Sequence, residues 1–346
     1  MKLIKAFAAP GPKVPLAPHQ IERREPTTHD VEIDILYCGV CHSDIHQVRD
    51  EWGSGIFPMV PGHEIVGKVT RVGSGANKFH VGDTVGVGCF VDSCRTCDPC
   101  HRGLEQFCEG GMTGTYNSKD REGRPTYGGY SKSIVVDEKY VLRVSDKIPL
   151  ERAAPLLCAG ITTFSPLRHW KIGKGHKVAV VGLGGLGHMA VKFANSFGAE
   201  VTVLSSTANK REAAKALGAH HYEVTSDPNT FTKLAGHFDY ILNTISAPHD
   251  YNAYLNLLRL DGTMTLVGVP EQAIPVHAFP LIMKRRNLSG SLIGGIAETQ
   301  EMLDYCAKHN IASDVEVIAA NQINTAYERM LKGDVKYRFV IDTKSL

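Results

Sequence analysis

Four cysteines in one short polar segment have the spacing of a metal site. Cys94, Cys97, Cys100 and Cys108 form the pattern C-x2-C-x2-C-x7-C. Two-residue gaps allow neighbouring thiolates to bind one ion, and four thiolates complete a closed tetrahedral zinc shell. Because such a shell has no open position, we expect the zinc to order a loop rather than to take part in a reaction. An iron–sulfur cluster is the alternative, but its bacterial cysteine runs continue with x3-C-P, which this segment lacks.

A glycine-rich turn follows a short apolar run near the middle of the chain, and the pattern predicts a helix after it. Its residues are Gly182, Gly184, Gly185, Leu186 and Gly187, which belong to a G-x-G-x-x-G motif. In a strand–turn–helix context the three motif glycines permit a tight turn, close approach of a pyrophosphate and close packing of helix on strand. The helix N-terminus adds unpaired N–H groups and a partial positive charge. The motif therefore predicts dinucleotide binding, with a purely structural glycine turn as the alternative.

The end of the next expected strand indicates which dinucleotide binds. An NAD site usually has an acidic residue there, which binds the ribose 2′-hydroxyl. Here the strand ends in Ser205, Ser206 and Thr207, and Lys210 and Arg211 follow. Small hydroxyl side chains leave room for a 2′-phosphate, and a basic side chain neutralises its charge. The sequence therefore predicts NADP(H); the alternative is a weak NAD site whose basic pair lies in a solvated helical turn.

The elements that must position these residues are of two kinds. Before residue 150 the pattern predicts short strands, at 31–37, 65–72, 81–87 and 133–144. From residue 178 strands alternate with helices, with strands at 178–181, 200–206, 238–244 and 262–269 and helices up to 197, at 210–218 and at 251–260. The remaining expected elements are helices at 298–309 and 324–333 and a strand at 337–342. This alternation predicts βαβ units and a parallel sheet, in a chain too long for one ordinary core.

Composition excludes several classes of function. The chain has 38 Lys plus Arg against 36 Asp plus Glu, so we expect neither a nucleic-acid nor a membrane partner. No apolar run approaches the ~18–20 residues of a membrane-spanning helix. The first residues contain Lys2, Lys5 and Pro10 and do not have the pattern of a signal peptide, so we expect a cytoplasmic protein. The odd number of cysteines, nine, argues against a closed disulfide framework.

Several motifs together resemble the zinc-containing alcohol dehydrogenases of the medium-chain dehydrogenase/reductase superfamily. Residues 62–76 fit the family's zinc signature, and the four-cysteine segment fits its structural-zinc lobe. The stretches that resemble cinnamyl alcohol dehydrogenases and related bacterial broad-specificity aldehyde reductases include YCGVCHSDIH (37–46), MTGTYNS (112–118), GLGGLGHMAVK (182–192) and YRFVID (337–342). The resemblance covers the whole chain. It implies an α/β protein with a GroES-like β-rich catalytic domain at 1–155 and 293–346 and a Rossmann doubly wound domain at 156–292.

The resemblance also implies a second, catalytic zinc. Its ligands would be Cys41, His63 and Cys158, a Cys2His set that leaves one position open. Spacing alone does not link these three residues. Asp44 would accept a hydrogen bond from the His63 ring and fix its tautomer. Glu64 would lie behind the metal, as an occasional fourth ligand or, alternatively, as part of a structural salt bridge.

Other roles follow from the same resemblance. Ser43 would be the first proton donor, and His46 would be the solvent end of the relay. Arg338 would reach the cofactor diphosphate, and Thr162 would lie near the nicotinamide. Candidates for an apolar substrate pocket are Trp52, Tyr116 and Ile293.

The implied activity is zinc-dependent interconversion of aldehydes and primary alcohols by hydride transfer, with NADP(H) and two zinc ions per chain. Aromatic, cinnamyl and medium aliphatic substrates are expected, with reduction favoured. Alternatives on the same fold are a polyol or secondary alcohol dehydrogenase and an NAD-preferring alcohol dehydrogenase. A zinc-free quinone or enoyl reductase would lack the ligand cysteines, and a non-catalytic NADP sensor would not need the relay. The family also implies a homodimer that pairs strands around residues 280–295.

Overall fold

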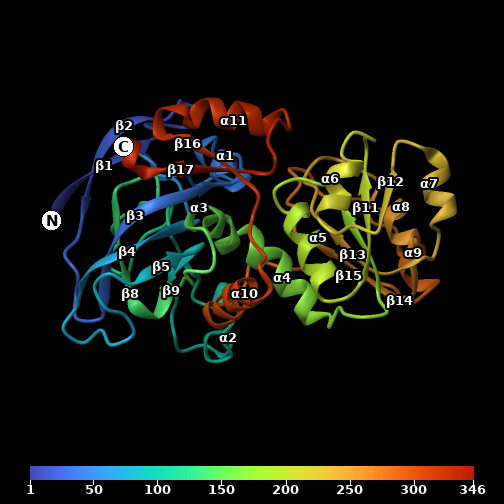
Figure 1. Cartoon of the computed structure of the whole chain (residues 1–346), viewed down its shortest axis with the longest axis horizontal. Helices are drawn as coiled ribbons and strands as arrows, with labels where there is room; N and C mark the ends of the chain where they lie inside the picture. The colour runs from blue at the N-terminus through green and yellow to red at the C-terminus, as the bar shows by residue number, and fades with distance from the viewer. The chain divides into compact units, whose positions relative to one another are not determined.

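The alternating segment at residues 31–37 forms part of an inner strand of the largest of the four sheets in the chain. The computed structural model describes every residue from 1 to 346. The chain folds into two compact units: one consists of Met1–Ile161 and Gly294–Leu346, and the other of Thr162–Ile293. We call these the first unit and the second unit. Figure 1 shows the C-terminal strands and helix of the first unit, drawn in red, beside its N-terminal strands, drawn in blue.

The first unit is built on a seven-stranded sheet. Its order is β16-β17-β3-β4-β5-β9, with β8 also paired to β3, and its pairs are antiparallel except β16 with β17. The strands are β3 (Asp30–Val40), β4 (Ile65–Val72), β5 (Thr84–Val87), β8 (Ser133–Asp137), β9 (Leu142–Arg143), β16 (Val315–Ala319) and β17 (Arg338–Asp342). Two antiparallel pairs complete the strands of this unit: β1 (Lys2–Ala8) with β2 (Ala17–Arg23), and β6 (Phe90–Asp92) with β7 (Thr113–Gly114).

Helices and 3-10 turns form connections between the strands of the first unit. The α-helices are α1 (His42–Val48), α2 (Asp98–His101), α3 (Leu150–Ala153), α10 (Ile296–His309) and α11 (Ile323–Leu331). The 3-10 turns are η1 (Glu105–Phe107), η2 (Glu138–Tyr140), η3 (Ala154–Leu157), η4 (Ala320–Gln322) and η5 (Thr343–Ser345). The division between the units falls within α4 (Ala159–His169).

The second unit is a parallel sheet connected by helices. Its order, β12-β11-β10-β13-β14-β15, is parallel throughout, which confirms the expected doubly wound fold. The strands are β10 (Lys177–Val181), β11 (Glu200–Ser205), β12 (His221–Val224), β13 (Phe238–Asn243), β14 (Leu258–Leu266) and β15 (Asn287–Gly290). The helices are α5 (Gly187–Ser196), α6 (Arg211–Ala216), α7 (Pro228–Lys233), α8 (Tyr251–Asn256) and α9 (Ala278–Ile282).

The central strands of the second unit explain why this sheet must be covered on both faces. Residues 178–181 of β10 are all buried although successive side chains point to opposite faces. The apolar core includes Phe238, Ile241 and Leu255, which pack with residues of β10 and β14. This burial holds the carboxyl ends of the strands at one edge, which is where open α/β sheets bind ligands.

Two sequence expectations about elements are wrong in detail. The single strand expected at 133–144 is interrupted by η2, because the Asp137 side chain accepts a hydrogen bond from the Lys139 N–H and starts a turn. The helix expected at 251–260 ends at Asn256, and Leu258 instead begins β14 by pairing with Phe238. The apolar run there fits either element, and its burial against the sheet decides for a strand.

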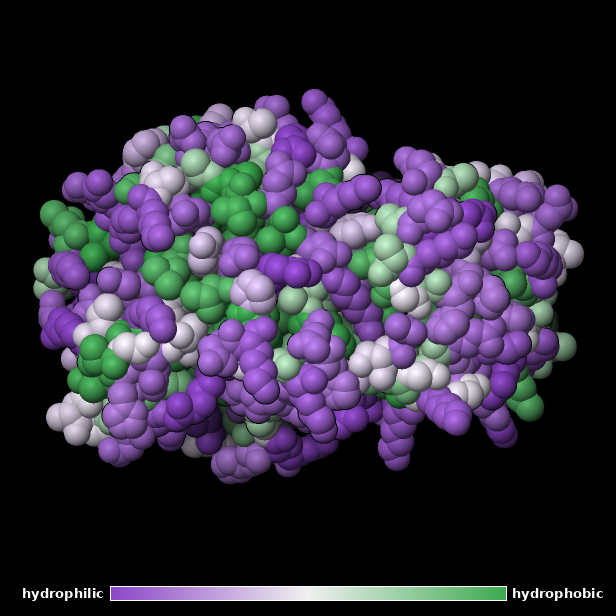
Figure 2. All heavy atoms as spheres, viewed as in Figure 1, coloured by the Kyte–Doolittle hydropathy of each residue, from purple (hydrophilic) through white to green (hydrophobic).

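The surface is mainly hydrophilic on the face drawn in Figure 2, as the balanced charge of the chain leads one to expect. None of the helices combines the length and the apolar character that crossing a membrane requires.

Candidate metal centres and dinucleotide-binding loop

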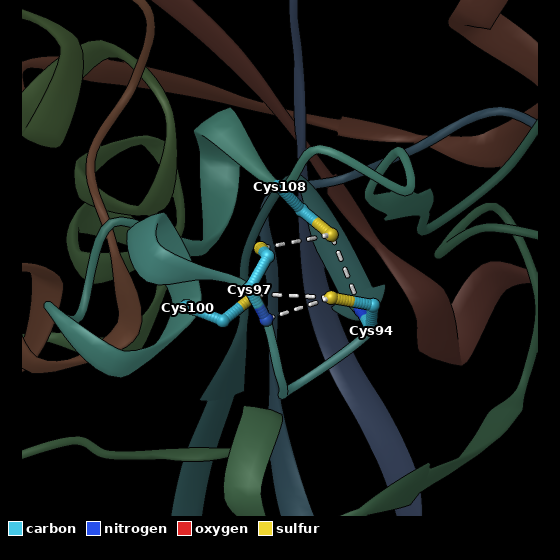
Figure 3. Close-up of side chains that lie close together, drawn as sticks. All are labelled: Cys94, Cys97, Cys100 and Cys108. Atoms are coloured by element: carbon cyan, nitrogen blue, oxygen red, sulfur yellow. Dashed lines mark hydrogen bonds between the residues drawn. The ribbon is translucent and has the colours of Figure 1, made fainter.

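The four-cysteine segment folds into a loop whose sulfur atoms converge (Figure 3). The ligand atoms of Cys94, Cys97, Cys100 and Cys108 all lie within 4.8 Å of one another. The Sγ–Sγ distance is 3.9 Å between Cys94 and Cys100 and 4.0 Å between Cys97 and Cys108. Two thiolates about 2.3 Å from one tetrahedral zinc lie about 3.8 Å apart, whereas a disulfide needs about 2.05 Å. The residues therefore fit a closed four-thiolate zinc site.

Backbone N–H groups of the same loop donate hydrogen bonds to its sulfur atoms and so favour the thiolate form that binds a metal. The N–H of Cys97 donates to Cys94 Sγ at 3.3 Å, and the N–H of Cys94 donates to Cys108 Sγ at 3.2 Å. The Thr96 and Cys97 N–H groups lower the pKa of the Cys94 thiol to about 5. Arg95 stabilises the loop by forming ion pairs with Asp92 and Asp137, each with a nitrogen–oxygen distance of 2.8 Å. A loop with little apolar packing is thus held ready for a cation that binds thiolates.

A second donor cluster lies inside the first unit. Cys41, His63, Glu64 and Cys158 are all buried, and their ligand atoms lie within 4.8 Å of one another. Cys41 comes just before α1, His63 and Glu64 come just before β4, and Cys158 lies between η3 and α4. The Sγ–Sγ distance between Cys41 and Cys158 is 3.9 Å, which again fits two thiolates on one zinc and not a disulfide. We call these four residues the second donor cluster.

Asp44 organises the backbone around this cluster. As the third residue of α1, it accepts from the Cys41 N–H at 2.8 Å and forms a capping box for the helix. Its other oxygen accepts from the Gly62 N–H and from His63 Nδ1, both at 3.2 Å. The contact expected between Asp44 and His63 is therefore present. Because Nδ1 donates to the carboxylate, Nε2 is left as the metal-binding nitrogen of His63.

Glu64 and Arg338 form a buried ion pair within the first unit. The Arg338 guanidinium donates to Glu64 Oε1, and both side chains are almost completely buried. Burial raises the pKa of Glu64, and the Arg338 charge opposes this rise. Glu64 Oε2 and Arg338 Nε have no hydrogen-bond partner. The salt-bridge alternative for Glu64 is thus present, and its carboxylate also belongs to the donor cluster. The diphosphate role expected for Arg338 stays a prediction.

The two residues expected to relay a proton both lie on α1. Ser43 Oγ is 3.7 Å from Cys41 Sγ and is half-buried. His46 Nδ1 pairs with the Glu51 carboxylate, and its ring stacks on Trp52 with 5.1 Å between centroids. Ser43 is therefore adjacent to the donor cluster, and His46 is fixed nearer the surface by a carboxylate that sequence reasoning did not identify.

Of the three residues expected to line the substrate pocket, only Tyr116 contacts the second donor cluster. Tyr116 is buried, its ring is stacked 5.8 Å from the His63 ring, and its hydroxyl has no hydrogen-bond partner. Trp52 is 45% exposed beside His46, and Ile293 is buried in the second unit. The structure thus brings Tyr116 to the second donor cluster, and the pocket role of the other two residues stays a prediction.

The glycine motif forms a tight turn between β10 and α5. Gly182 has φ +88°, a conformation that favours glycine, and a Cβ on Gly187 would lie 2.1 Å from the Gly182 carbonyl oxygen. A Cβ on Gly184 would meet no atom within 4 Å, so that face of the turn is open. These are the three features required of a pyrophosphate-binding turn at a helix N-terminus. Gly185 and Leu186 complete the turn before α5 begins at Gly187.

The residues expected to bind the 2′-phosphate lie around the end of β11. Ser205 ends the strand, and Ser206 and Thr207 are exposed. Lys210 Nζ donates to the Leu183 carbonyl oxygen of the glycine turn at 3.1 Å. Arg211 instead points to Tyr222, donating to its carbonyl oxygen at 2.7 Å. Of the two basic residues, Lys210 is therefore the one beside the turn.

Sequence reasoning missed several residues at these sites. Thr244, directly after β13, donates to the Val181 carbonyl oxygen at 2.8 Å and supports the glycine turn. Its position at the carboxyl end of a parallel strand is the signal that could have identified it. Tyr130 and Tyr327 lie behind Asp44, and the Tyr130 hydroxyl donates to it. Thr162, expected near the nicotinamide, is buried in α4 at the start of the second unit.

Comparisons with known proteins cover nearly the whole chain. The family model "Alcohol dehydrogenase GroES-like domain" matches residues 27–146, and the model "Zinc-binding dehydrogenase" matches residues 185–308. The chain is 61% identical to "NADP-dependent alcohol dehydrogenase C 1" of Mycolicibacterium smegmatis, over 100% of this chain and 99% of that protein. It is 58% identical to "Aldehyde reductase YahK" of Escherichia coli, over 99% of each. A solved cinnamyl alcohol dehydrogenase from Sorghum bicolor superposes with a TM-score of 0.97 at 44% identity, covering 99% of this chain and 98% of that one.

Proposed function

The chain belongs to the zinc-containing alcohol dehydrogenases of the medium-chain dehydrogenase/reductase superfamily, in the subgroup of the cinnamyl alcohol dehydrogenases, and we propose that its Cys41–His63–Cys158 site reduces aldehydes to primary alcohols. The protein is an NADP-dependent zinc oxidoreductase that interconverts alcohols and aldehydes. The observation that carries the proposed site is the buried Cys2His donor set, with 3.9 Å between its sulfur atoms.

Two bound groups supply the chemistry that side chains lack. Zinc in a Cys2His site with an open position acts as a Lewis acid toward a carbonyl oxygen. NADPH supplies the hydride. The closed four-cysteine site has no open position and stabilises its loop.

The chain's own side chains hold the ligands and move the proton. Asp44 keeps Nδ1 of His63 protonated and leaves Nε2 for the metal. Ser43 Oγ, adjacent to Cys41 Sγ, donates the proton that the product alcohol needs. His46, whose ring Glu51 holds, exchanges the proton with solvent. Glu64, whose carboxylate belongs to the second donor cluster, would serve as an occasional fourth ligand of the metal.

The cofactor is held by the second unit. Its diphosphate binds the glycine turn at Gly182–Gly187 and the N-terminus of α5. Its 2′-phosphate binds the hydroxyls of Ser205, Ser206 and Thr207 and the ammonium group of Lys210. From the family resemblance, Arg338 is proposed to contact the diphosphate and Thr162 to lie near the nicotinamide. The preference for NADPH favours reduction, because that pool is usually kept reduced.

The expected substrates are aromatic, cinnamyl and medium aliphatic aldehydes. Tyr116 supports this class, because its buried ring lies beside the His63 ring and offers an apolar wall. Trp52 and Ile293 are the other proposed wall residues.

The test is to measure kcat/KM for cinnamaldehyde, benzaldehyde and hexanal with NADPH and with NADH. We expect NADPH-selective reduction of all three; turnover of polyols or secondary alcohols instead, or equal rates with NADH, would overturn the proposal.

The working form is proposed to be a cytoplasmic homodimer. The edge strand β15 is supported as the pairing element by exposed apolar side chains on α9 and just after it: Phe279 at 71%, Ile282 at 66% and Met283 at 71% exposed. Large exposed apolar groups of this kind mark surfaces that associate. Sedimentation equilibrium should give twice the 37.7 kDa chain mass, and Ile282→Asp should shift it toward the monomer.

A further inference from the structure

A line of buried polar groups leads from the C-terminal helix α11 to the imidazole of the second donor cluster. The Tyr327 hydroxyl donates to the Tyr130 hydroxyl oxygen at 3.4 Å, and Tyr130 donates to Asp44 Oδ2 at 3.2 Å. Asp44 in turn accepts from His63 Nδ1 at 3.2 Å. All four side chains are buried. The line joins residues that are up to 283 positions apart in the sequence.

The direction of these bonds follows from which groups can donate. An ionised carboxylate only accepts, so Tyr130 must give its proton to the bond with Asp44. The Tyr130 oxygen is then free to accept from Tyr327. Burial, followed by the charge of Asp44, raises the pKa of both tyrosines well above the ordinary value. Both hydroxyls therefore stay protonated and remain donors.

Packing holds Tyr130 in a single place. Gly62, with φ +103°, lies against its ring, and a Cβ on that glycine would come within 2.7 Å of Tyr130 Cδ1. The Tyr130 N–H also donates to the Pro61 carbonyl oxygen at 3.0 Å. The tyrosine is thus fastened to the segment that carries His63, and its hydroxyl reaches across to the carboxylate that holds the His63 ring.

We propose that Tyr130, supported by Tyr327, is a positioning residue for the catalytic zinc. It fixes the Asp44 carboxylate, which fixes the orientation and tautomer of the His63 ring. This inference rests on the proposed zinc site at Cys41, His63 and Cys158. Direct hydrogen-bond partners of metal ligands typically contribute 10- to 100-fold to metal affinity, and Tyr130 acts one step behind such a partner, so its contribution should lie at or below the lower end of this range.

The test removes one hydroxyl and keeps the ring. Tyr130→Phe should weaken zinc binding at the second donor cluster by up to about 10-fold in competition with a chelator, while the zinc of the four-cysteine site stays as tight as before. The variant also loses one buried hydrogen bond to a carboxylate, so its unfolding temperature should fall by no more than about 3–12 °C. The matched control is Tyr240→Phe, which removes the buried, unpartnered hydroxyl of a tyrosine in β13 of the second unit. That variant should bind both zinc ions as the wild type does.

A second variant separates positioning from packing. Because Tyr327 acts through Tyr130, Tyr327→Phe should weaken zinc binding by a smaller factor in the wild type and by no further factor in the Tyr130→Phe background. If Tyr327 acted on the zinc site by a path that does not pass through Tyr130, the two effects would instead add. The cobalt-substituted protein offers a spectroscopic readout, since a shifted His63 ring changes the visible absorption bands.

The outcomes distinguish this inference from the function on which it rests. A wild-type chain that binds fewer than two zinc ions would overturn the proposed catalytic site itself. A wild type with two zinc ions, and a Tyr130→Phe variant of equal zinc affinity, would overturn the positioning role alone. If Tyr130→Phe does not fold, Tyr327→Phe decides, and wild-type zinc affinity in that variant overturns the inference.

Discussion

Replacing Glu64 with glutamine tests the buried ion pair that the structure places beside the proposed catalytic zinc. The substitution keeps the shape of the side chain and removes its charge, so that the buried guanidinium of Arg338 loses its carboxylate partner. Breaking a buried pair by removing one charge costs about 3–5 kcal/mol. For a domain of this size each kcal/mol lowers the unfolding temperature by about 2–4 °C, so we expect a decrease of about 6–20 °C.

The assay is thermal unfolding of the full-length, zinc-loaded protein, followed by circular dichroism. Glu64→Gln combined with Arg338→Met removes both charges and should recover much of the lost stability, because an uncharged pair leaves no buried ion without a partner. Asp261→Asn is the matched control, since Asp261 and its partner Arg285 are exposed and such pairs contribute little. An unfolding temperature of Glu64→Gln equal to that of the wild type would refute the reasoning.

The remaining predictions concern the metal, the cofactor and the proton path. Cys158→Ala should lower the zinc content from two ions to one and abolish turnover while NADPH still binds; surviving activity would show that this thiol is not a ligand. Lys210→Ala should lower the ratio of kcat/KM with NADPH to that with NADH by about 10- to 150-fold, the equivalent of a charge-assisted hydrogen bond of about 1.5–3 kcal/mol. Ser205→Asp should favour NADH because a carboxylate repels the 2′-phosphate, and an unchanged cofactor ratio would place that phosphate elsewhere. His46→Ala should lower kcat by about 100-fold or less, because water partly replaces the outer end of a relay; a larger loss would give His46 a more direct role.

The parts of the site that the sequence predicts are those that lie close together in it. The four cysteines between residues 94 and 108 carry their own spacing, and the glycine motif lies within six residues. Their structures follow local rules for metal loops and for strand–turn–helix units. The contact of Asp44 with His63 was expected from the family motif, and it is present.

The contacts that sequence reasoning missed join distant segments. Glu64 and Arg338 are 274 positions apart, and only the pairing of β17 beside β3 brings them together. Tyr327 reaches Tyr130 for the same kind of reason, since α11 packs within the unit that begins at Met1. A single sequence contains no signal for such pairs, because each residue alone fits a surface or a core position equally well.

The errors in the expected elements have a related origin. The run NLLRL, residues 256–260, is apolar enough for a helix or for a strand. In the structure Leu257 and Leu258 are fully buried, and Leu258 pairs with Phe238 of the neighbouring strand. Tertiary packing therefore overrides the local pattern at this point.

Stepwise removal and return of zinc, with NADPH-driven reduction of benzaldehyde followed at each step, tests the central claim most directly. We predict that activity falls in proportion to the loss of one of two zinc ions per chain and returns when that zinc is restored. The Cys158→Ala variant, which retains the four-cysteine site, should stay inactive at every zinc concentration. Full activity in protein that lacks zinc at Cys41, His63 and Cys158 would contradict the account.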